Sequence, residues 1–398
     1  MTLKITPFKL KGEVYAPPSK SMAHRNLICG AFSEKSVIKN VAFSKDILST
    51  LEALKSLGTA VEIKGDTVSL GGFGVGAINP EFCCNESGST LRFMLPICAT
   101  LGQKIKLTGT ERLFSRDLSA FEDFAKRYSI AFEKGEDYAY VCGRLTSGEY
   151  EIDASLSSQF VSGLLFALAY VGGQSVIRLL SKVESRPYID LTVKSLCDFG
   201  AEVYFENEST LKINSSRFKS REVFVEGDYS NAAFLDAFNF VGNDVKVLGL
   251  LSDSLQGDKI YREYFSLLGK EPLDLSDCPD LAPVLFALAA TVGKCEFVGT
   301  KRLKIKESDR AAAMKEELEK FGVKVEVFDN SVTVHGGKIH APREVLDSHN
   351  DHRIVMALSV LLSLVGGEIS GEGAVEKSYP DYFKVIEKLK ERTNEKRN

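Results

Sequence analysis

Several features that mark secreted, membrane or metal-dependent proteins are missing from this chain of 398 residues. The longest apolar runs, such as residues 354–367, are too short to cross a bilayer, and the first ten residues lack the apolar core of a secretion signal. The eight cysteines form no CxxC pair, which favours reduced structural thiols. The five histidines show no HExxH or similar ligand spacing. We therefore expect a cytoplasmic protein without a metal site.

The charge distribution argues against one large class of partner. The formal net charge is -4 at pH 7, and no stretch forms a long basic stripe. We therefore expect no nucleic acid partner, and any anion that the protein binds should be small. The length of the chain and its 44% of apolar residues predict a globular protein of two domains.

What the sequence does contain is one structural unit repeated six times. An apolar helix rich in glycine and alanine recurs after a small or polar start, and a β-rich stretch, an amphipathic helix and usually a hairpin follow it. The copies are about 70 residues apart, except where PLDLSDCP replaces a full hairpin between the fourth and fifth copies. The six helices begin near Ser21, Ser89, Ser158, Asn231, Asp280 and Asp351.

The repeats also predict where the domains divide. Three units per domain is the natural division, and the stretch VFVEGDYSN and the two prolines at 17 and 18 mark the breaks. We expect an N-terminal domain at residues 17–225 and a C-terminal domain made of residues 1–16 and 226–398. The chain would then cross twice between them.

Cations stand at helix starts, where the helix dipole disfavours them. Lys20 and Arg25 in PPSKSMAHR open an apolar helix, and Arg92, Arg310 and Arg353 are expected in the first turns of others. Anionic ligands would explain this placement, because helix amino termini and cations both attract them. A repeat scaffold without catalytic activity is the alternative interpretation.

Seven short motifs resemble those of one enzyme family. PSKSMAHR, ESGSTLR, SSQF, SRPYID, KESDR, NDHR and KSYPDYF occur in the order found in 5-enolpyruvylshikimate-3-phosphate synthases. The resemblance implies transfer of the enolpyruvyl group of phosphoenolpyruvate to the 5-hydroxyl of shikimate 3-phosphate, with no metal or other cofactor. It also implies an α/β fold, a two-domain inside-out α/β barrel with buried parallel helices, a cleft between the domains as the active site, and a monomer.

The resemblance also assigns residues to shikimate 3-phosphate. Lys20 would reach both substrates, since a compact ammonium can serve two anionic groups, and Lys306 would bind shikimate 3-phosphate as well. Arg186 lies where the family also carries a basic residue. The other shikimate 3-phosphate ligands implied are Ser21, Arg25, Ser157, Ser158, Gln159, Ser185, Tyr188 and Asp280.

A second set of residues resembles the family's phosphoenolpyruvate site. Gly88 would let a backbone N–H approach the ligand, and guanidinium groups would hold its phosphate and carboxylate. Glu86 replaces the asparagine common in the family and stays outside the expected site, because a carboxylate repels an anion unless it is protonated or paired. The implied ligands are Lys20, Gly88, Ser89, Arg92, Arg116, Gln159, Arg310, Arg353 and Lys377.

The catalytic residues implied are Asp280, Glu307 and Lys20. Asp280 would accept the proton of the 5-hydroxyl, and Glu307 would protonate the methylene of phosphoenolpyruvate. His352 would either orient the cationic ligands of phosphoenolpyruvate or have a structural role. The reaction would then proceed by addition and elimination through a tetrahedral intermediate.

Two rival enzymes share the architecture. A UDP-N-acetylglucosamine enolpyruvyl transferase usually carries a reactive cysteine on a loop of the first domain, and GTERLFSRD has none. An RNA 3′-phosphate cyclase uses a nucleotidylated histidine, for which NDHR offers the one attractive feature. A non-catalytic protein that binds phosphorylated metabolites is the rival from outside the enzymes.

Overall fold

The computed structural model describes residues 2–155 and 157–395, which fall into two compact units. One unit is Pro18–Glu226, and the other joins the residues up to Pro17 with those from Gly227 onward. Each unit has its own hydrophobic core. No helix within the described residues is long and apolar enough to cross a membrane.

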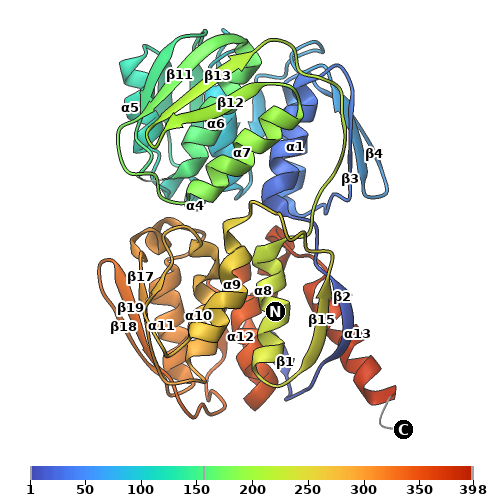
Figure 1. Cartoon of the computed structure of the whole chain (residues 1–398), viewed down its shortest axis with the longest axis vertical. Helices are drawn as coiled ribbons and strands as arrows, with labels where there is room; N and C mark the ends of the chain where they lie inside the picture. The colour runs from blue at the N-terminus through green and yellow to red at the C-terminus, as the bar shows by residue number, and fades with distance from the viewer. Residues whose placement is uncertain (1, 156, 396–398) are drawn as a thin grey trace. The chain divides into compact units, whose positions relative to one another are not determined.

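Three buried helices form the centre of the unit Pro18–Glu226 (Figure 1). These are α1 (Lys20–Phe32), α3 (Gly88–Cys98) and α6 (Ser158–Val171), and nearly all their residues beyond the first turn are buried. A helix that is apolar on all sides requires such an interior position. α3 and α6 approach closely at Gly163, where a β-carbon would stand 2.5 Å from the carbonyl oxygen of Arg92.

Serines begin these three helices. The hydroxyl of Ser19 accepts from the N–H of Met22, Ser87 accepts from Thr90, and Ser157 accepts from Gln159. Such caps satisfy backbone donors that the first turn of a helix leaves open. They fix the helix starts close to the positions that the repeats predict.

Amphipathic helices and three sheets surround the central helices of this unit. The outer helices are α2 (Lys45–Ser56), α5 (Ser119–Arg127) and α7 (Arg186–Asp198), and a short α4 (Glu111–Ser115) precedes α5. In each sheet one parallel pair is followed by two antiparallel pairs. The strand order of the first sheet is β14 (Glu222–Phe224), β3 (Ser36–Lys39), β5 (Thr67–Gly71) and β4 (Ala60–Lys64). That of the second sheet is β6 (Glu81–Cys83), β7 (Ile105–Thr108), β9 (Tyr138–Cys142) and β8 (Ala131–Lys134). That of the third sheet is β10 (Glu149–Ile152), β11 (Gly173–Leu179), β13 (Thr210–Ser215) and β12 (Glu202–Asn207).

The second unit repeats this plan with less regular sheets. Its central helices are α8 (Tyr229–Phe240), α10 (Ala282–Ala289) and α12 (His352–Val365), and its outer helices are α9 (Tyr261–Leu267), α11 (Arg310–Lys320) and α13 (Tyr382–Glu395). Four 3-10 turns precede helices or follow strands: η1 (Gly257–Ile260), η2 (Pro279–Leu281), η3 (Lys301–Ile305) and η4 (Glu372–Lys377). The hairpin of β18 (Lys324–Val327) and β19 (Ser331–His335) packs beside α10 and α11 (Figure 1).

The first strands of the chain complete this unit. β1 (Thr2–Ile5) pairs antiparallel with β21 (Gly367–Ser370), and β2 (Lys11–Tyr15) pairs parallel with β15 (Asp244–Leu248). The remaining strands are β16 (Leu273–Asp274) and β17 (Lys294–Val298), which join the β18–β19 hairpin, and β20 (Leu346–Asp347), which pairs with β21. The short β16 occupies the PLDLSDCP stretch, which confirms that the fourth unit lacks a full hairpin.

Two expectations about helix starts need correction. Arg25 is the sixth residue of α1 and Arg92 the fifth of α3, so both lie beyond the first turn. Lys20 is the first residue of α1. The cause is that Ser19 and Ser87 are the caps, which starts each helix earlier than a cap at Ser21 or Ser89 would.

Candidate functional site

The residues implicated by sequence fall into two clusters, one in each unit. The first, which we call the serine-cap cluster, gathers at the starts of α1, α3 and α6. The second, which we call the Asp280 cluster, gathers around η2 and the starts of α11 and α12.

Lys20 lies at the edge of the serine-cap cluster. Its Nζ forms an ion pair with Oδ2 of Asp46 on α2 at 2.7 Å, and the two side chains are 14% and 11% exposed. Ser21 is partly exposed beside it. A partly shielded ammonium on a flexible stem can turn from its carboxylate to an anionic ligand.

Arg25 links α1 to α7. Its guanidinium donates to the carbonyl oxygens of Ser21 at 2.7 Å and Tyr188 at 2.8 Å, and to Oγ1 of Thr192 at 2.8 Å. Burial lowers the pKa of Arg25 to about 10. Ser185, just before α7, is buried and has a left-handed backbone with φ of 56°. Arg25 therefore joins the helix that carries Tyr188 and Thr192 to α1.

A chain of polar side chains joins the starts of α3 and α6. Nη1 of Arg92 donates to Oε1 of Gln159 at 3.0 Å, and Nε2 of Gln159 donates to Oγ of Ser89 at 2.8 Å. Ser157 accepts from the N–H of Gln159 at 3.2 Å, and Ser158 is buried. The structure therefore brings Ser89, Arg92 and Gln159 together.

Arg116 covers the first residue of α3. A β-carbon on Gly88 would stand 2.5 Å from Nη1 of Arg116 and 2.9 Å from its Cζ. Nε of Arg116 is buried and has no hydrogen-bond partner within the described part of the chain. The absence of a side chain at position 88 therefore makes room for this guanidinium at a helix amino terminus, where an anion is favoured.

In the second unit, three cations surround the carboxylate of Asp280. Oδ1 lies 2.7 Å from Nη1 of Arg310 and 3.4 Å from Nζ of Lys306, and Oδ2 lies 2.8 Å from Nη2 of Arg353. Asp280 belongs to the turn η2 before α10, and the side chain is 17% exposed. Its carboxylate therefore binds cations, and the N-cap position of α10 belongs to Leu281.

Two further carboxylates meet Arg310, which is almost fully buried. Its Nη2 lies 2.7 Å from Oε2 of Glu307, and its Nε lies 2.9 Å from Oδ2 of Asp351. Ser308 also donates to Oδ2 of Asp351 at 3.0 Å. Nη2 of Arg310 donates to Glu307, and although burial lowers the pKa of the neighbouring Lys306, the charge of Glu307 acts to raise it.

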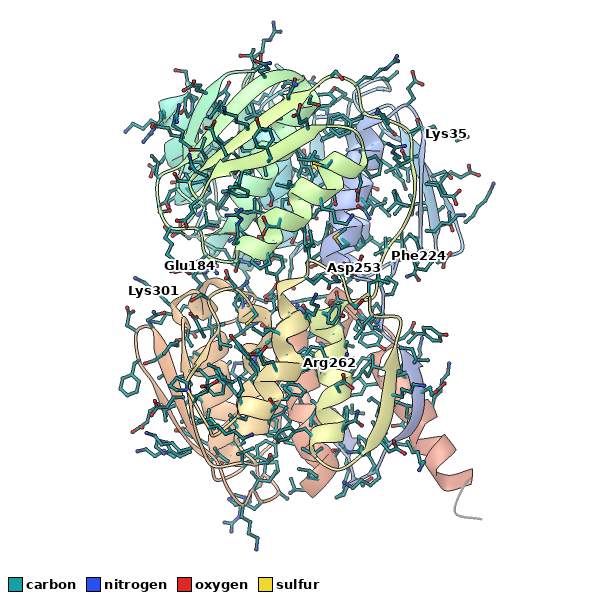
Figure 2. The ribbon with its side chains drawn as sticks, in the orientation of Figure 1. Lys35, Glu184, Phe224, Asp253, Arg262 and Lys301 are labelled. Atoms are coloured by element: carbon teal, nitrogen blue, oxygen red, sulfur yellow. The ribbon has the colours of Figure 1, made fainter. Side chains whose placement is uncertain are left out.

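Lys377 and His352 complete this cluster. Nζ of Lys377 donates to the carbonyl oxygen of Asn350 at 2.6 Å, and His352 is buried at the first position of α12. Lys301, at the start of η3, lies at the surface (Figure 2), whereas Lys306 after its end contacts Asp280. Lys304, between them, pairs with Asp329 instead.

The cations control the proton affinity of this cluster. Although burial opposes ionisation, Arg353, Lys306 and Arg310 hold the pKa of Asp280 well below its ordinary range. Burial lowers the pKa of Lys306 to about 8, and Asp280 partly offsets this effect. The pKa of Asp258, a buried carboxyl on η1, rises to about 7 because of burial and the nearby charge of Asp280. These are the perturbed groups expected where protons move.

Several residues in these clusters were not predicted from the sequence to be part of a site. Asp46, Thr192 and Asp258 were not singled out, and Asp351 was identified only as a helix start. Asp46 stands in the first turn of an outer helix, a position that any solvated carboxylate favours. The local sequence therefore does not distinguish Asp46 from an ordinary surface carboxylate at a helix start.

Comparison with known proteins places the chain among relatives over its whole length. The family model described as EPSP synthase (3-phosphoshikimate 1-carboxyvinyltransferase) matches residues 5–386. A 3-phosphoshikimate 1-carboxyvinyltransferase of Clostridium kluyveri is 39% identical, with 97% of each chain covered. One of Clostridioides difficile is 37% identical, covering 99% of this chain and 98% of the relative.

Solved structures share the fold. An EPSP synthase from Acinetobacter baumannii superposes with a TM-score of 0.79 at 21% identity, covering 98% of each chain. The enolpyruvyl transferase NikO from Streptomyces tendae superposes with a TM-score of 0.77 at 16% identity, covering 98% of this chain and 97% of the other. These similarities confirm the expected fold class, a two-domain inside-out α/β fold.

Proposed function

Because the chain belongs to the EPSP synthase family, we propose that its two charged clusters bind and convert the substrates of that reaction. The activity is that of a 3-phosphoshikimate 1-carboxyvinyltransferase of the shikimate pathway, which serves aromatic amino acid biosynthesis. It transfers the enolpyruvyl group of phosphoenolpyruvate to the 5-hydroxyl of shikimate 3-phosphate and releases phosphate. The sugar-nucleotide transferase, the RNA cyclase and the scaffold are thereby set aside.

The observation that best supports the residue roles is the ion cluster around Asp280. Three cations contact its carboxylate and keep it anionic. Phosphoenolpyruvate carries a carboxylate and a phosphate, and both compete with Asp280 for Arg310 and Arg353. As these cations turn to the substrate, Asp280 and Glu307 lose stabilising partners and their proton affinity rises. Substrate binding would thus activate the carboxylates that must exchange protons.

The proton transfers follow from this change. Glu307 protonates the methylene carbon of phosphoenolpyruvate, which makes the neighbouring carbon electron-poor, and the 5-hydroxyl oxygen attacks that carbon while Asp280 takes its proton. A tetrahedral intermediate results, in which one carbon carries both the former 5-hydroxyl oxygen of shikimate 3-phosphate and the phosphate. Loss of a methyl proton and cleavage of the carbon–oxygen bond to phosphate then give the enolpyruvyl product. Lys20 and the guanidinium groups stabilise the negative charge of both substrates and of the leaving phosphate.

The serine-cap cluster supplies the remaining contacts. Ser157, Ser158 and Gln159 offer hydroxyls and an amide to shikimate 3-phosphate, and Gly88, Ser89, Arg92 and Arg116 offer donors to phosphoenolpyruvate. Ser21, Ser185 and Tyr188 extend the first set, whereas the Asp280 cluster adds Lys306 to the first set and Lys377 to the second. Arg25 would act on the shikimate 3-phosphate side mainly by holding α7 through Tyr188 and Thr192.

We also propose that the enzyme works as a cytoplasmic monomer without nucleic acid. The negative net charge supports the absence of a nucleic acid partner. The eight free cysteines, five of them buried, are consistent with a reducing compartment.

Phosphate release tests the assignment of substrates. Purified protein should release inorganic phosphate from phosphoenolpyruvate with shikimate 3-phosphate, but not with either compound alone or with UDP-N-acetylglucosamine as acceptor. Release with the sugar nucleotide only would refute the assignment.

Lys20→Met should raise KM for both substrates, because one ammonium serves both.

A further inference from the structure

Glu317 on α11 is a fully buried carboxylate outside the set of proposed ligands. It follows Arg310 by seven residues, which is close to two helical turns, so both side chains project from one face of α11. A buried carboxylate is costly unless it is paired and hydrogen-bonded. Its partners therefore indicate what it does.

Glu317 binds one cation on its own helix and two groups of a distant segment. Nζ of Lys320 lies 2.9 Å from Oε1 and 3.0 Å from Oε2. Oε2 also accepts from the backbone N–H of Asp347 at 2.9 Å, and Oε1 lies 3.0 Å from Nε2 of His349. Two contacts therefore connect α11 to the segment 347–351, which joins β20 to α12.

The backbone of this segment is held in an unfavourable conformation. His349 and Asn350 have φ values of 49° and 53°, in the left-handed region that most side chains disfavour and that Asn and His tolerate better than others. The N–H of Ser348 donates to the carbonyl oxygen of Ser370 at 3.1 Å, and that of Asp351 donates to Ser348 at 2.9 Å. Such a backbone persists only where its surroundings hold it, and Glu317 supplies two of the contacts.

The segment in turn contacts three proposed phosphoenolpyruvate ligands. Asp351 accepts from Nε of Arg310 at 2.9 Å and from the backbone N–H of Arg353 at 2.9 Å. The carbonyl oxygen of Asn350 accepts from Nζ of Lys377 at 2.6 Å. A shift of the segment would therefore move a partner of the Arg310 side chain, a partner of the Lys377 side chain and the cap that holds the backbone of Arg353.

We propose that Glu317 is a positioning residue for phosphoenolpyruvate binding. It acts through Asp347 and His349 on the segment 347–351, and this segment sets the places of Arg310, Arg353 and Lys377. The inference rests on the proposed function, because that function assigns the three cations to phosphoenolpyruvate.

A metal site is the alternative interpretation of these residues. Ligand atoms of Glu316, Glu317 and His349 all lie within 4.8 Å of one another. The ammonium of Lys320, however, lies within 3.0 Å of both oxygens of Glu317. A metal cation would have to displace it, so the contacts favour an ion pair that holds the segment.

Three substitutions and a matched control test the proposal. His349→Asn removes the ring contact while keeping a residue type that accepts the left-handed backbone. Glu317→Gln keeps an oxygen for the N–H of Asp347, and Glu317→Ala removes every contact. His335→Asn is the control, because His335 forms the comparable pair with Glu326, at 2.8 Å, within the β18–β19 hairpin.

We expect KM for phosphoenolpyruvate to rise about tenfold in Glu317→Ala, as is usual when a supporting partner of a ligand is lost. Glu317→Gln and His349→Asn should show smaller rises, and KM for shikimate 3-phosphate should change less than about twofold in all three. Backbone hydrogen exchange in residues 346–353 should be faster in the same order. His335→Asn should match the wild type in each measurement.

The proposal is overturned if a folded Glu317→Ala enzyme keeps its KM for phosphoenolpyruvate, or if both KM values rise equally. Unchanged hydrogen exchange in residues 346–353 would also overturn it. An Arg353→Gln enzyme distinguishes failure of the role proposed for Glu317 from failure of the proposed function. If Arg353→Gln also keeps its KM for phosphoenolpyruvate, the ligand assignment is wrong; if only the Glu317 series does, the role of Glu317 is wrong.

Discussion

The guanidinium of Arg116 lies against the α-carbon of Gly88, so close that a β-carbon there would stand 2.5 Å from Nη1. Gly88 opens α3, and its neighbours Ser89 and Arg92 reach Gln159 through hydrogen bonds. The glycine and the arginine therefore form one structural pair. The helix start can bind an anion with a guanidinium beside it only because position 88 has no side chain.

Gly88→Ala should displace the Arg116 guanidinium and weaken the use of phosphoenolpyruvate. Loss of one charge-assisted hydrogen bond costs about 1.5–3 kcal/mol, which corresponds to a rise in KM of roughly 10- to 150-fold. Steady-state kinetics of Gly88→Ala, Arg116→Ala and the double variant test this. The double variant should be little worse than Arg116→Ala alone, because both changes remove the same contact. Fully additive effects would contradict the pairing.

The pH dependence of shikimate 3-phosphate use should reveal Lys306. Burial lowers the pKa of its ammonium to about 8, so the charge is present below that pH and is lost as pH rises through it. We expect kcat/KM for shikimate 3-phosphate to fall above about pH 8. Lys306→Arg should move that fall to higher pH, because a guanidinium stays protonated.

Lys304→Arg is the control for this experiment, since Lys304 is 46% exposed and pairs with Asp329. An alkaline limb that is identical in the wild type and Lys306→Arg would rule out Lys306 as its source.

Gly163→Ala should destabilise the unit Pro18–Glu226. The new methyl group would stand 2.5 Å from the carbonyl oxygen of Arg92 and 3.1 Å from Cα of Phe93, so α3 and α6 would have to separate. Such overpacking typically costs about 1–3 kcal/mol of the free energy of unfolding. Chemical denaturation measures it, with Gly148→Ala as the control because the nearest atom to a β-carbon there is 3.7 Å away. Equal stability of the two variants would refute the close approach.

Much of the fold could be predicted from sequence because each unit repeats the same local signals. Apolar helices such as α6 and α12 lack a polar face, and strand pairs such as β12–β13 alternate around turn residues. The shortened fourth unit was visible in PLDLSDCP, since no second alternating stretch follows it. Helix starts were less exact, because neighbouring serines such as Ser19 and Ser21 offer equally good caps.

The sequence named candidate residues for the site but did not indicate their contacts. Motifs named Asp280, Arg310 and Arg353, but the sequence does not show that all three meet in one ion cluster. Arg25 donates to Thr192, a residue 167 positions later, and no pattern in either segment indicates that pairing. Contacts of this kind depend on the packing of α1 against α7, which local signals do not encode.

The measurement that tests the central claim most directly is the turnover of Asp280→Asn. The amide cannot accept the 5-hydroxyl proton, so kcat should fall about 100-fold or more. KM for phosphoenolpyruvate should stay near the wild-type value or decrease, because Arg310, Arg353 and Lys306 lose a competing carboxylate. Asp277→Asn, which changes an exposed carboxylate three residues earlier, is the control and should keep normal turnover. A folded Asp280→Asn enzyme with near-normal kcat would contradict the assignment of Asp280 as the base.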